Sequence, residues 1–308
     1  MTALPVGVVI NPTSGKGKGA KAAAKVWQAL AAEATVDLSG ASYEAAMTNA
    51  RAAVTDGAIG ALIVVGGDGM VHLGVNACAN SQVPLGIVAA GTGNDSAVAL
   101  GLPLDDAAES VAVALKFRSN PRRVDVLSGE SRASLDAPEG SRKFLSFGTI
   151  SAGFDALVNA RANRMSWPKG SSRYQVAMVL ELAKFRGIKY RAAIDGTERR
   201  LEAMLCAVAN APAFGGGMLI APHAKFDDGK LDLFLVHRIK RSTLLRIFPS
   251  VYKGGHVSHP AVEFVEATQV RLDNGDLPTY ADGEFVGYSP VTATISPGAL
   301  LVCAPPKS

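Results

Sequence analysis

The sequence predicts an α/β domain with a doubly wound parallel sheet, followed by a β-rich domain with largely antiparallel strands. Through about residue 128, short apolar runs alternate with helical patterns, which is typical of a parallel sheet covered by helices. From Phe144 onward, short segments of alternating polarity replace that pattern, as expected for antiparallel strands. We therefore expect one domain over residues 1–130 and a second over 131–308, whose last strand could return to the first domain.

Composition restricts the class of protein. Of the 308 residues, 48% are hydrophobic and 19% are charged, so a sizeable core is expected and a disordered chain is excluded. A net charge of only +4 disfavours a strongly electrostatic nucleic-acid binder, and we expect no nucleic-acid partner. Cys78, Cys206 and Cys303 are far apart, which indicates buried or idle thiols in a reducing compartment. With no basic leader and no apolar run approaching about 18 residues, a cytoplasmic location is predicted.

The first domain is expected to alternate short strands with helices. Ser42 is the expected N-cap of one helix, and Asp106 with Glu109 forms a capping box for another. The expected strands are Val6–Ile10, Thr35–Leu38, Ala61–Val65, Val83–Ala89 and Val124–Leu127. The expected helices cover 20–33, 42–56 and 106–117, with two more beginning near residues 70 and 95.

Three loops rich in glycine or hydroxyl groups follow strands of this sheet, over 11–19, 66–69 and 91–95. The carboxyl ends of parallel strands meet at one edge of a sheet, where ligands bind in this class. We expect the glycines of 66–69 to turn the chain through positive φ and to let a phosphate approach closely. A tight turn or a solvated loop could explain one such loop, but three at one edge predict a phosphate-bearing ligand.

Two details qualify this phosphate site. The loop 11–19 is not a P-loop, because the spacing G-x-x-x-x-G-K-[ST] is absent. Ser39 or Ser42 could offer a hydroxyl at the end of the second strand, and capping is the favoured role of Ser42.

The second domain is interpreted as short strands interrupted by helices. The polar segment 128–142 is either a linker or a hairpin loop. The helical pattern over 172–185 fits a core helix or a lipid-facing lid, and a core helix is favoured. Helices are also expected over 156–163 and 242–252. The expected strands cover 144–150, 188–195, 201–209, 231–237, 262–272 and 291–303.

Two stretches of the second domain carry candidate chemistry. Asp228-Gly229 is either a hairpin turn or, with turn carbonyls beside the carboxylate, a site for a hard cation. Asp282 and Glu284 lie two residues apart in a loop, where paired carboxylates can orient and deprotonate a hydroxyl. From this loop alone, an ordinary charged turn is favoured.

Together these motifs resemble the diacylglycerol kinase catalytic-domain family of soluble bacterial lipid kinases, which also includes sphingosine and ceramide kinases. The motifs occur in the family's order and extend over essentially the whole chain, and GTGND after GGDG with a late DGE is specific. The matching positions are Asn11–Gly15, Gly66–Gly69, Gly91–Asp95, Gly216–Met218 with Pro222–Asp232, and Asp282–Glu284.

The resemblance implies an N-terminal nucleotide domain, a sandwich-like C-terminal domain and an active site in the cleft between them. It implies Glu284 as general base with Asp282 beside it, and Asp68 and Asp95 near the transferring phosphate and its Mg²⁺. A structural Mg²⁺ would be held by Asp228 and the backbone carbonyls of Lys225 and Lys230. The loops and the resemblance together give these expected ATP-binding residues: Asn11, Pro12, Thr13, Ser14, Gly15, Ser39, Gly66, Gly67, Asp68, Gly69, Met70, Val71, His72, Thr92, Gly93, Asn94 and Asp95.

The chain departs from the family pattern after the GGDG motif. Met70 stands where the family usually has Thr, and His72-Leu73 stands where relatives commonly have Asn-Glu. Loss of that polar pair argues against the distantly similar NAD kinases, and it leaves the nucleotide preference open. His72 is interpreted as a satisfied surface or core histidine rather than a catalytic one.

The predicted function is ATP- and Mg²⁺-dependent phosphorylation of a lipid hydroxyl, converting diacylglycerol to phosphatidic acid. The alternatives are a kinase of a sphingoid base or another alcohol, and a nucleotide-binding regulatory module without turnover. We expect peripheral contact with the inner face of the membrane through Arg161, Arg164, Trp167 and Lys169, although an ordinary exposed loop would fit the same residues. A homodimer is left open.

Overall fold

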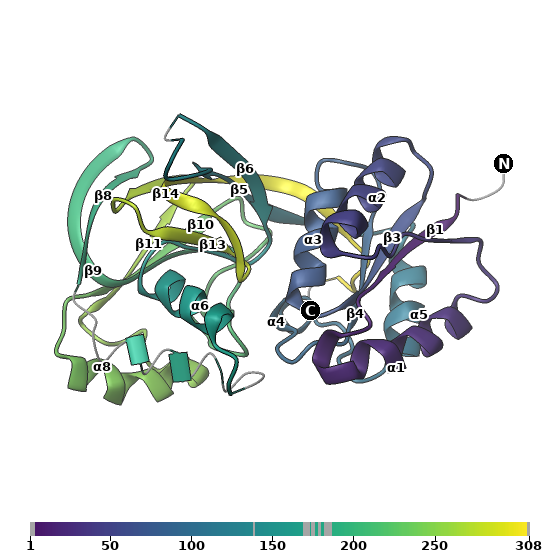
Figure 1. Cartoon of the computed structure of the whole chain (residues 1–308), viewed down its shortest axis with the longest axis horizontal. Helices are drawn as coiled ribbons and strands as arrows, with labels where there is room; N and C mark the ends of the chain where they lie inside the picture. Colours follow the sequence, from purple (N-terminus) through teal and green to yellow (C-terminus); the bar gives the residue numbers. More distant parts are fainter. Residues whose placement is uncertain are drawn as a thin grey trace. The chain divides into compact units, whose positions relative to one another are not determined.

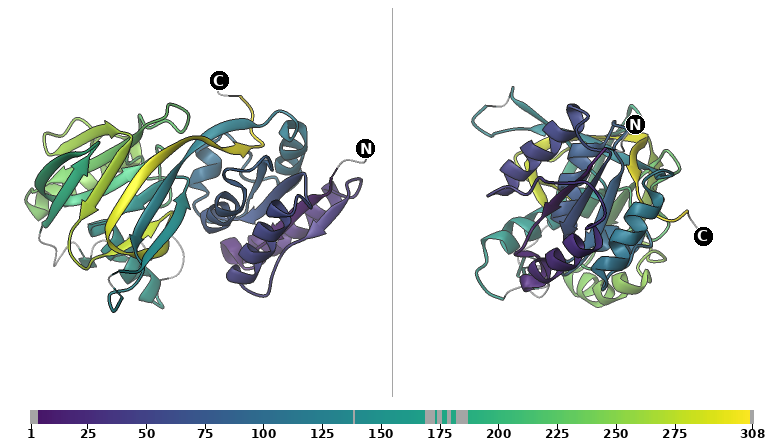
Figure 2. Two further views of the ribbon diagram at one scale, coloured as in Figure 1. Left: turned by 90° about the horizontal axis from the view of Figure 1, so that it is seen from above. Right: turned by 90° about the vertical axis from the view of Figure 1, so that its right-hand side faces the viewer.

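The computed structural model of the chain divides into two units. Unit 1 comprises residues 1–126 and 298–308, and unit 2 comprises residues 127–297. The chain passes between the units within strand β5 (Arg122–Arg132) and within the long strand β14 (Glu284–Val302), which is drawn in yellow in Figure 2. The residues that the structure describes are 4–137, 139–168, 173, 176–177, 180–181 and 187–306.

Unit 1 is built on a parallel sheet with the strand order β4-β3-β1-β2. The central strands are buried along nearly their whole length, which explains their continuous apolar sequences. Val302 of β14 pairs in parallel with Leu85 at the outer side of β4. The strands of this sheet are β1 (Val6–Ile10), β2 (Thr35–Asp37), β3 (Ala61–Gly66) and β4 (Leu85–Ala89).

Helices pack on both faces of this sheet (Figure 1), because successive apolar side chains of the central strands point to opposite faces and both faces must be covered. Ile63 and Val65 of β3 belong to a core cluster with α1 and α5, whereas Val64 lies against Gly74 of α3, which packs on α2. The predicted doubly wound α/β architecture is therefore confirmed. The helices are α1 (Ser14–Ala29), α2 (Tyr43–Thr55), α3 (Asp68–Cys78), α4 (Asp95–Ala99) and α5 (Ala107–Phe117).

The N-caps of unit 1 follow the prediction, but one helix boundary does not. The Ser42 hydroxyl accepts from the N–H of Ala45, and the Asp106 carboxylate accepts from those of Ala108 and Glu109. The helix expected over 20–33 instead spans Ser14–Ala29, with left-handed φ values of 58°, 59° and 93° at residues 15–17. Residues 15–17 are therefore not α-helical, and the regular helix begins after them, close to the predicted start, whereas it ends at Ala29 rather than at residue 33.

Unit 2 consists of antiparallel strands whose pairing closes on itself. Starting from β9, the pairs run through β8, β12, β14, β13 and β7 and return to β9, while β10 and β11 extend the sheet from β9. This confirms the predicted β-rich, antiparallel second domain. The strands are β6 (Ser141–Ser146), β7 (Thr149–Ser151), β8 (Ile188–Ile194), β9 (Thr197–Ala209), β10 (Leu231–His237), β11 (Val262–Ala267), β12 (Gln269–Asp273) and β13 (Pro278–Ala281).

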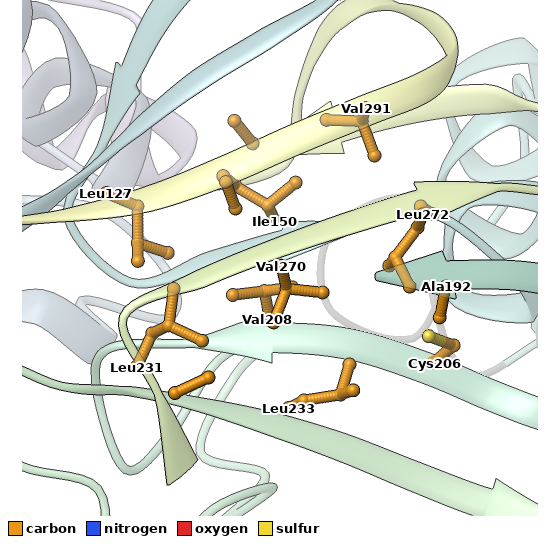
Figure 3. Packing of buried hydrophobic residues seen from close by; sticks show 14 of the residues in the cluster. Leu127, Ile150, Ala192, Cys206, Val208, Leu231, Leu233, Val270, Leu272 and Val291 are labelled. Carbon is orange, nitrogen blue, oxygen red and sulfur yellow. The ribbon is translucent and has the colours of Figure 1, made fainter. Parts of the chain in front are cut away.

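Two apolar clusters stabilise unit 2. The first joins side chains from strands throughout the ring, including Ile150, Val208 and Val270 (Figure 3). The second joins the outer side of β9 and β10 to α6 (Phe154–Arg164), α8 (Arg241–Ile247) and the 3₁₀ helix η1 (Phe248–Lys253). Burial of the apolar surface of these two clusters is the main favourable contribution to the folding of unit 2.

Several predicted boundaries in unit 2 are corrected. The strand expected over 262–272 is broken at Thr268, because the Asp195 carboxylate accepts from its N–H and hydroxyl groups at 3.0 and 2.8 Å. The segment 128–142 is largely a hairpin of β5 and β6 rather than a linker. The helix expected over 242–252 divides into α8 and η1, and the strand expected over 291–303 is the last part of β14.

The cysteines, the lengths of the helices and the segment 172–185 bear on three further predictions. Cys78, Cys206 and Cys303 are buried thiols that form no disulfide, as predicted, and burial raises the pKa of the Cys303 thiol to about 12. Among the helices of the described residues, none has the length and apolar content that crossing a bilayer requires. Most of the expected helix over 172–185 lies outside the described residues, so its core and lid interpretations remain predictions.

Candidate functional site

The three loops predicted to bind phosphate meet at the carboxyl edge of the unit 1 sheet. A methyl group added to Gly15 would overlap the carbonyl oxygen of Ala90, so the first loop packs directly against the start of the third. A methyl group added to Gly66 would lie 2.9 Å from the Ser14 hydroxyl, and one on Gly67 would lie 3.1 Å from Cα of Gly91. The three loops therefore form one continuous backbone surface.

The reason for glycine at two of these positions differs from the prediction. Gly66 and Gly67 do not have positive φ, although Gly15 does, with φ 58°. A Cβ on Gly66 would overlap the Met70 side chain, and a Cβ on Gly91 would overlap Cα of Gly67. Close packing of loop against loop, rather than an unusual backbone conformation, thus requires glycine here.

Hydrogen bonds fix the first loop. The Asn11 side-chain oxygen accepts from the N–H and the hydroxyl of Thr13, at 3.0 and 2.8 Å. The Ser39 hydroxyl accepts from the N–H of Ile10 at 2.9 Å, at the end of β1. Ser39 therefore lies beside the start of this loop, and its own O–H remains a donor. Pro12 and Thr13 are exposed, as expected of residues that meet a ligand.

The second and third loops are joined by a carboxylate. Asp68, the first residue of α3, accepts from the N–H of Ser96 in α4 at 3.0 Å. Asn94 adopts φ 60° and its side-chain oxygen accepts from the N–H of Gly91 at 2.8 Å. Asp95 is 8% exposed. These bonds hold 91–96 against the start of α3, whose positive dipole end favours an anion.

The departures from the family pattern lie inside the protein. Met70, Val71 and His72 are buried, so they could meet a ligand mainly through their backbone groups. The Asn76 side chain donates to the carbonyl oxygen of His72 and lies 3.3 Å from its Nε2. This environment agrees with the interpretation of His72 as a satisfied histidine.

In unit 2, Asp282 and Glu284 occupy a tight hairpin between β13 and β14. Asp282 and Gly283 both have positive φ, at 50° and 86°, and Ala281 pairs with Glu284 across the turn. A two-residue turn with this geometry suits Asp-Gly. The hairpin carries the two carboxylates in the predicted order, but their surroundings are very different.

The Asp282 carboxylate binds the loop between β6 and β7. Its Oδ1 accepts from the Ser146 hydroxyl and from the N–H groups of Gly148 and Thr149, at 2.8, 2.8 and 3.1 Å, and its Oδ2 accepts from the N–H of Phe147 at 2.9 Å. Consecutive N–H groups around one carboxylate form a strong, charge-assisted anchor. This loop could not be predicted from sequence patterns, because three of its four donors to Asp282 are backbone N–H groups.

Glu284 has no such anchor. Its side chain is exposed and makes no hydrogen bond or ion pair with any residue in the described part of the chain. The neighbouring Phe285 is itself 38% exposed and packs edge-on against Tyr280 and Tyr288, with ring centroids 5.7 and 5.2 Å apart. Glu284 is therefore an accessible carboxylate on a firmly held turn.

The predicted cation residues lie in the turns before β10. Asp228 Oδ1 accepts from the N–H of Lys230 at 3.1 Å, and the Lys230 ammonium pairs with Glu266. Asp232 is 6% exposed, and burial raises the pKa of its carboxyl. Its Oδ1 accepts no hydrogen bond from the described residues but lies 3.4 Å from Nε2 of His223. No group of three or more His, Cys, Asp or Glu side chains in that part of the chain is placed to hold a metal. A cation here would thus depend on backbone carbonyls and water as well.

An apolar cavity that the sequence did not predict lies in the second cluster of unit 2. It has a volume of about 50 Å³, and its lining is almost wholly apolar. A cavity of this size could hold several water-sized groups, but without polar partners it favours hydrocarbon. Its walls include Phe154, Ala207 and Phe234 on one side, and Leu244, Ile247, Phe248 and Val251 on the other.

The segment predicted to contact the membrane is described in part. Trp167 is 78% exposed, and Arg164 is exposed at the end of α6. Arg161 pairs with Glu181, so its charge is partly compensated. Lys169 lies outside the described residues. Membrane contact by this segment remains a prediction.

Comparison with known proteins is consistent along the whole chain. Residues 5–128 match the family model described as the diacylglycerol kinase catalytic domain, and residues 148–304 match the YegS C-terminal NAD kinase beta sandwich-like domain. A diacylglycerol kinase of Mycobacterium tuberculosis is 36% identical over 304 residues, which is 97% of this chain and 95% of that protein. A diacylglycerol kinase of Staphylococcus carnosus is 26% identical over 92% of this chain and 89% of its own.

Solved structures show the same fold. The crystal structure of a diacylglycerol kinase from Bacillus anthracis aligns with a TM-score of 0.72 at 21% identity, covering 99% of this chain and 98% of that one. The extent of the match to the mycobacterial relative, with the ordered motifs and the two-unit architecture, shows that the chain belongs to the diacylglycerol kinase family of lipid kinase phosphotransferases.

Proposed function

We propose that the protein transfers the γ-phosphate of ATP, with Mg²⁺, to the free hydroxyl of diacylglycerol, forming phosphatidic acid. The observation that carries this proposal is the continuous backbone surface made by the loops after β1, β3 and β4, in a chain of this family. Phosphoryl transfer needs positioned phosphates, neutralised charge and an oriented nucleophile rather than extensive covalent catalysis.

The nucleotide is assigned to unit 1. In this proposal the phosphates lie on the backbone N–H groups of Asn11–Gly15, Gly66–Gly69 and Gly91–Asp95, and Ser39 and Thr92 offer hydroxyls. The N-terminal end of α3 supports a negative charge at this place. Met70, Val71 and His72 contribute only through their backbone, because their side chains are buried.

The acceptor hydroxyl is assigned to Glu284. Its carboxylate takes the hydroxyl proton as the hydroxyl oxygen attacks the γ-phosphorus, the bond to the bridging oxygen breaks, and ADP leaves. An exposed carboxylate that makes no hydrogen bond or ion pair with the described residues suits this role. The carboxylate oxygens of Asp282 accept hydrogen bonds from residues 146–149. Asp282 is therefore proposed as a positioning residue that holds the hairpin.

The carboxylates in the loops fit a hard cation, because Mg²⁺ prefers oxygen ligands. Asp68 and Asp95 would hold the ion that neutralises charge on the phosphates. Asp228, with the carbonyls of Lys225 and Lys230, would hold a second, structural ion.

The basic test is transfer of label from γ-labelled ATP to diacylglycerol dispersed in detergent. We expect labelled phosphatidic acid to form with Mg²⁺, to disappear when EDTA is added, and to return when Mg²⁺ is restored in excess. Tight ATP binding without transfer to any alcohol would instead support a regulatory module. Label on a sphingoid base but not on diacylglycerol would change the acceptor.

The apolar cavity of unit 2 is proposed to take part of an acyl chain. Leu244→Trp would fill the cavity, and losing about two buried methylenes at about 0.8 kcal/mol each should raise KM for dioleoylglycerol roughly tenfold. Dihexanoylglycerol, whose short chains gain less from burial, should be affected little. Leu245→Trp, on the 49% exposed neighbour in the same helix, is the matched control and should leave both KM values near wild type. Equal KM changes for the two lipids would contradict this assignment.

A further inference from the structure

The stretch that begins after β10 carries an unusual run of charge. From residue 238 to residue 262 the sequence contains five Lys or Arg residues and no Asp or Glu. Basic and acidic residues are nearly balanced over the whole chain, at 31 and 27, so this excess is local. We call the five residues the basic cover: Arg238, Lys240, Arg241, Arg246 and Lys253.

All five side chains of the basic cover are exposed. Arg238, Lys240 and Arg241 line an open groove of about 800 Å³, together with Met204 and one carboxylate, Glu202. Glu202 lies 3.4 Å from Arg238 and compensates its charge, whereas the exposed Lys240 adds a further positive charge. The groove therefore presents net positive charge on a concave surface of unit 2.

The helices α8 and η1, which carry Arg241, Arg246 and Lys253, have two distinct sides. Leu244, Ile247, Phe248 and Val251 point to the apolar cavity and the second core cluster. Arg246 and Lys253 are exposed, as is Leu245, which is 49% accessible. A helix with an apolar inner side, a basic outer side and an exposed leucine is typical of elements that lie on the surface of anionic membranes.

We propose that the basic cover docks the protein onto bilayers that contain anionic phospholipids, with lipid phosphates in the groove beside Arg238, Lys240 and Arg241. Charge complementarity identifies the partner, because each Lys or Arg near an anionic bilayer strengthens binding about fivefold. Lys240, Arg246 and Lys253 are exposed and have no ion-pair partner among the described residues. The inference rests on the proposed function only in that a lipid acceptor lies in the bilayer. It assigns docking to a surface other than the segment around Trp167.

Another exposed basic surface of unit 2 provides a contrast. Lys189, Arg200 and Arg271 are exposed on β8, β9 and β12, but acidic side chains alternate with them. Arg191 on the same surface pairs with Asp273 at 2.7 Å, and Glu198 lines the same hollow. This mixed surface should attract an anionic bilayer much less than the basic cover does.

The test is co-sedimentation of the full chain with vesicles of phosphatidylcholine alone or mixed equally with phosphatidylglycerol. Lys240→Gln, Arg246→Gln and Lys253→Gln combined should weaken binding to the mixed vesicles about a hundredfold. The matched control combines Lys189→Gln, Arg200→Gln and Arg271→Gln, which removes the same net charge, and it should change binding less than threefold. Wild-type protein should bind vesicles of phosphatidylcholine alone far more weakly.

The results separate this inference from the proposed kinase activity. The inference is overturned if the first triple variant binds mixed vesicles as wild type does, if both triple variants lose equally, or if wild type does not bind them. On detergent-dispersed dihexanoylglycerol, the first triple variant should keep wild-type turnover. If wild type phosphorylates no lipid and yet the vesicle results hold, the kinase proposal fails while the docking surface stands.

Discussion

Glu284→Gln is expected to lower kcat for phosphorylation of diacylglycerol about a thousandfold. Glutamine keeps the size of the side chain and its hydrogen-bonding oxygen, but it cannot take the proton of the acceptor hydroxyl. General bases typically contribute 10²–10⁴-fold to the rate, so the expected loss is on the order of 10³. KM for ATP should change little, because this residue is assigned to the acceptor.

The same variant should leave stability unchanged, since the Glu284 side chain is exposed and has no hydrogen-bond or ion-pair partner among the described residues. Measurement of kcat beside the thermal unfolding midpoint distinguishes the two effects. Glu198→Gln, on an exposed glutamate of β9 in the same unit, is the matched control and should keep full activity. More than a tenth of wild-type kcat in Glu284→Gln would contradict the assignment of Glu284 as the base.

Asp282→Ala is expected to cause a large loss of stability, in contrast to Glu284→Gln, which should lower kcat without destabilising the protein. The substitution removes the acceptor of four hydrogen bonds and leaves the N–H groups of residues 147–149 without their partner. Hydrogen bonds to charged groups contribute about 1.5–3 kcal/mol each, but they are not additive, so a loss of about 3 kcal/mol is expected. For a unit of this size, that corresponds to roughly 6–12 °C in the unfolding midpoint.

Asp282→Asn provides an internal comparison. The amide keeps an oxygen for the donors at Oδ1, but its NH₂ group faces the N–H of Phe147, so the midpoint should lie between those of wild type and Asp282→Ala. Asp136→Ala, on an exposed loop aspartate, should leave the midpoint within about 1 °C. An unchanged midpoint in Asp282→Ala would show that Asp282 does not anchor the hairpin.

The parts of this protein that could be predicted from sequence are those with local signals. The buried strands β1 and β3 are continuous apolar runs, and Ser42 and Asp106 cap helices through neighbouring backbone groups. The three glycine-rich loops are predicted to lie at one edge because the carboxyl ends of parallel strands meet there. Each of these inferences depends on residues that are close in sequence.

The features that could not be predicted depend on contacts between residues that are far apart in the sequence. Asp195 breaks a strand at Thr268, 73 residues away, and Asp282 binds a loop more than 130 residues before it. Gly66 and Gly91 are needed because loops pack together, which no local pattern of positive φ would reveal. The apolar cavity is lined by strands and helices from several parts of unit 2, so it exists only in the folded chain.

The most direct test of the account is to offer diacylglycerol and sphingosine together, with labelled ATP and Mg²⁺, and to identify the products by mass spectrometry. Wild-type protein is expected to give phosphatidic acid as the labelled product, and Glu284→Gln is expected to give almost none. Labelled sphingosine phosphate alone, or release of inorganic phosphate without any phosphorylated lipid, would contradict it.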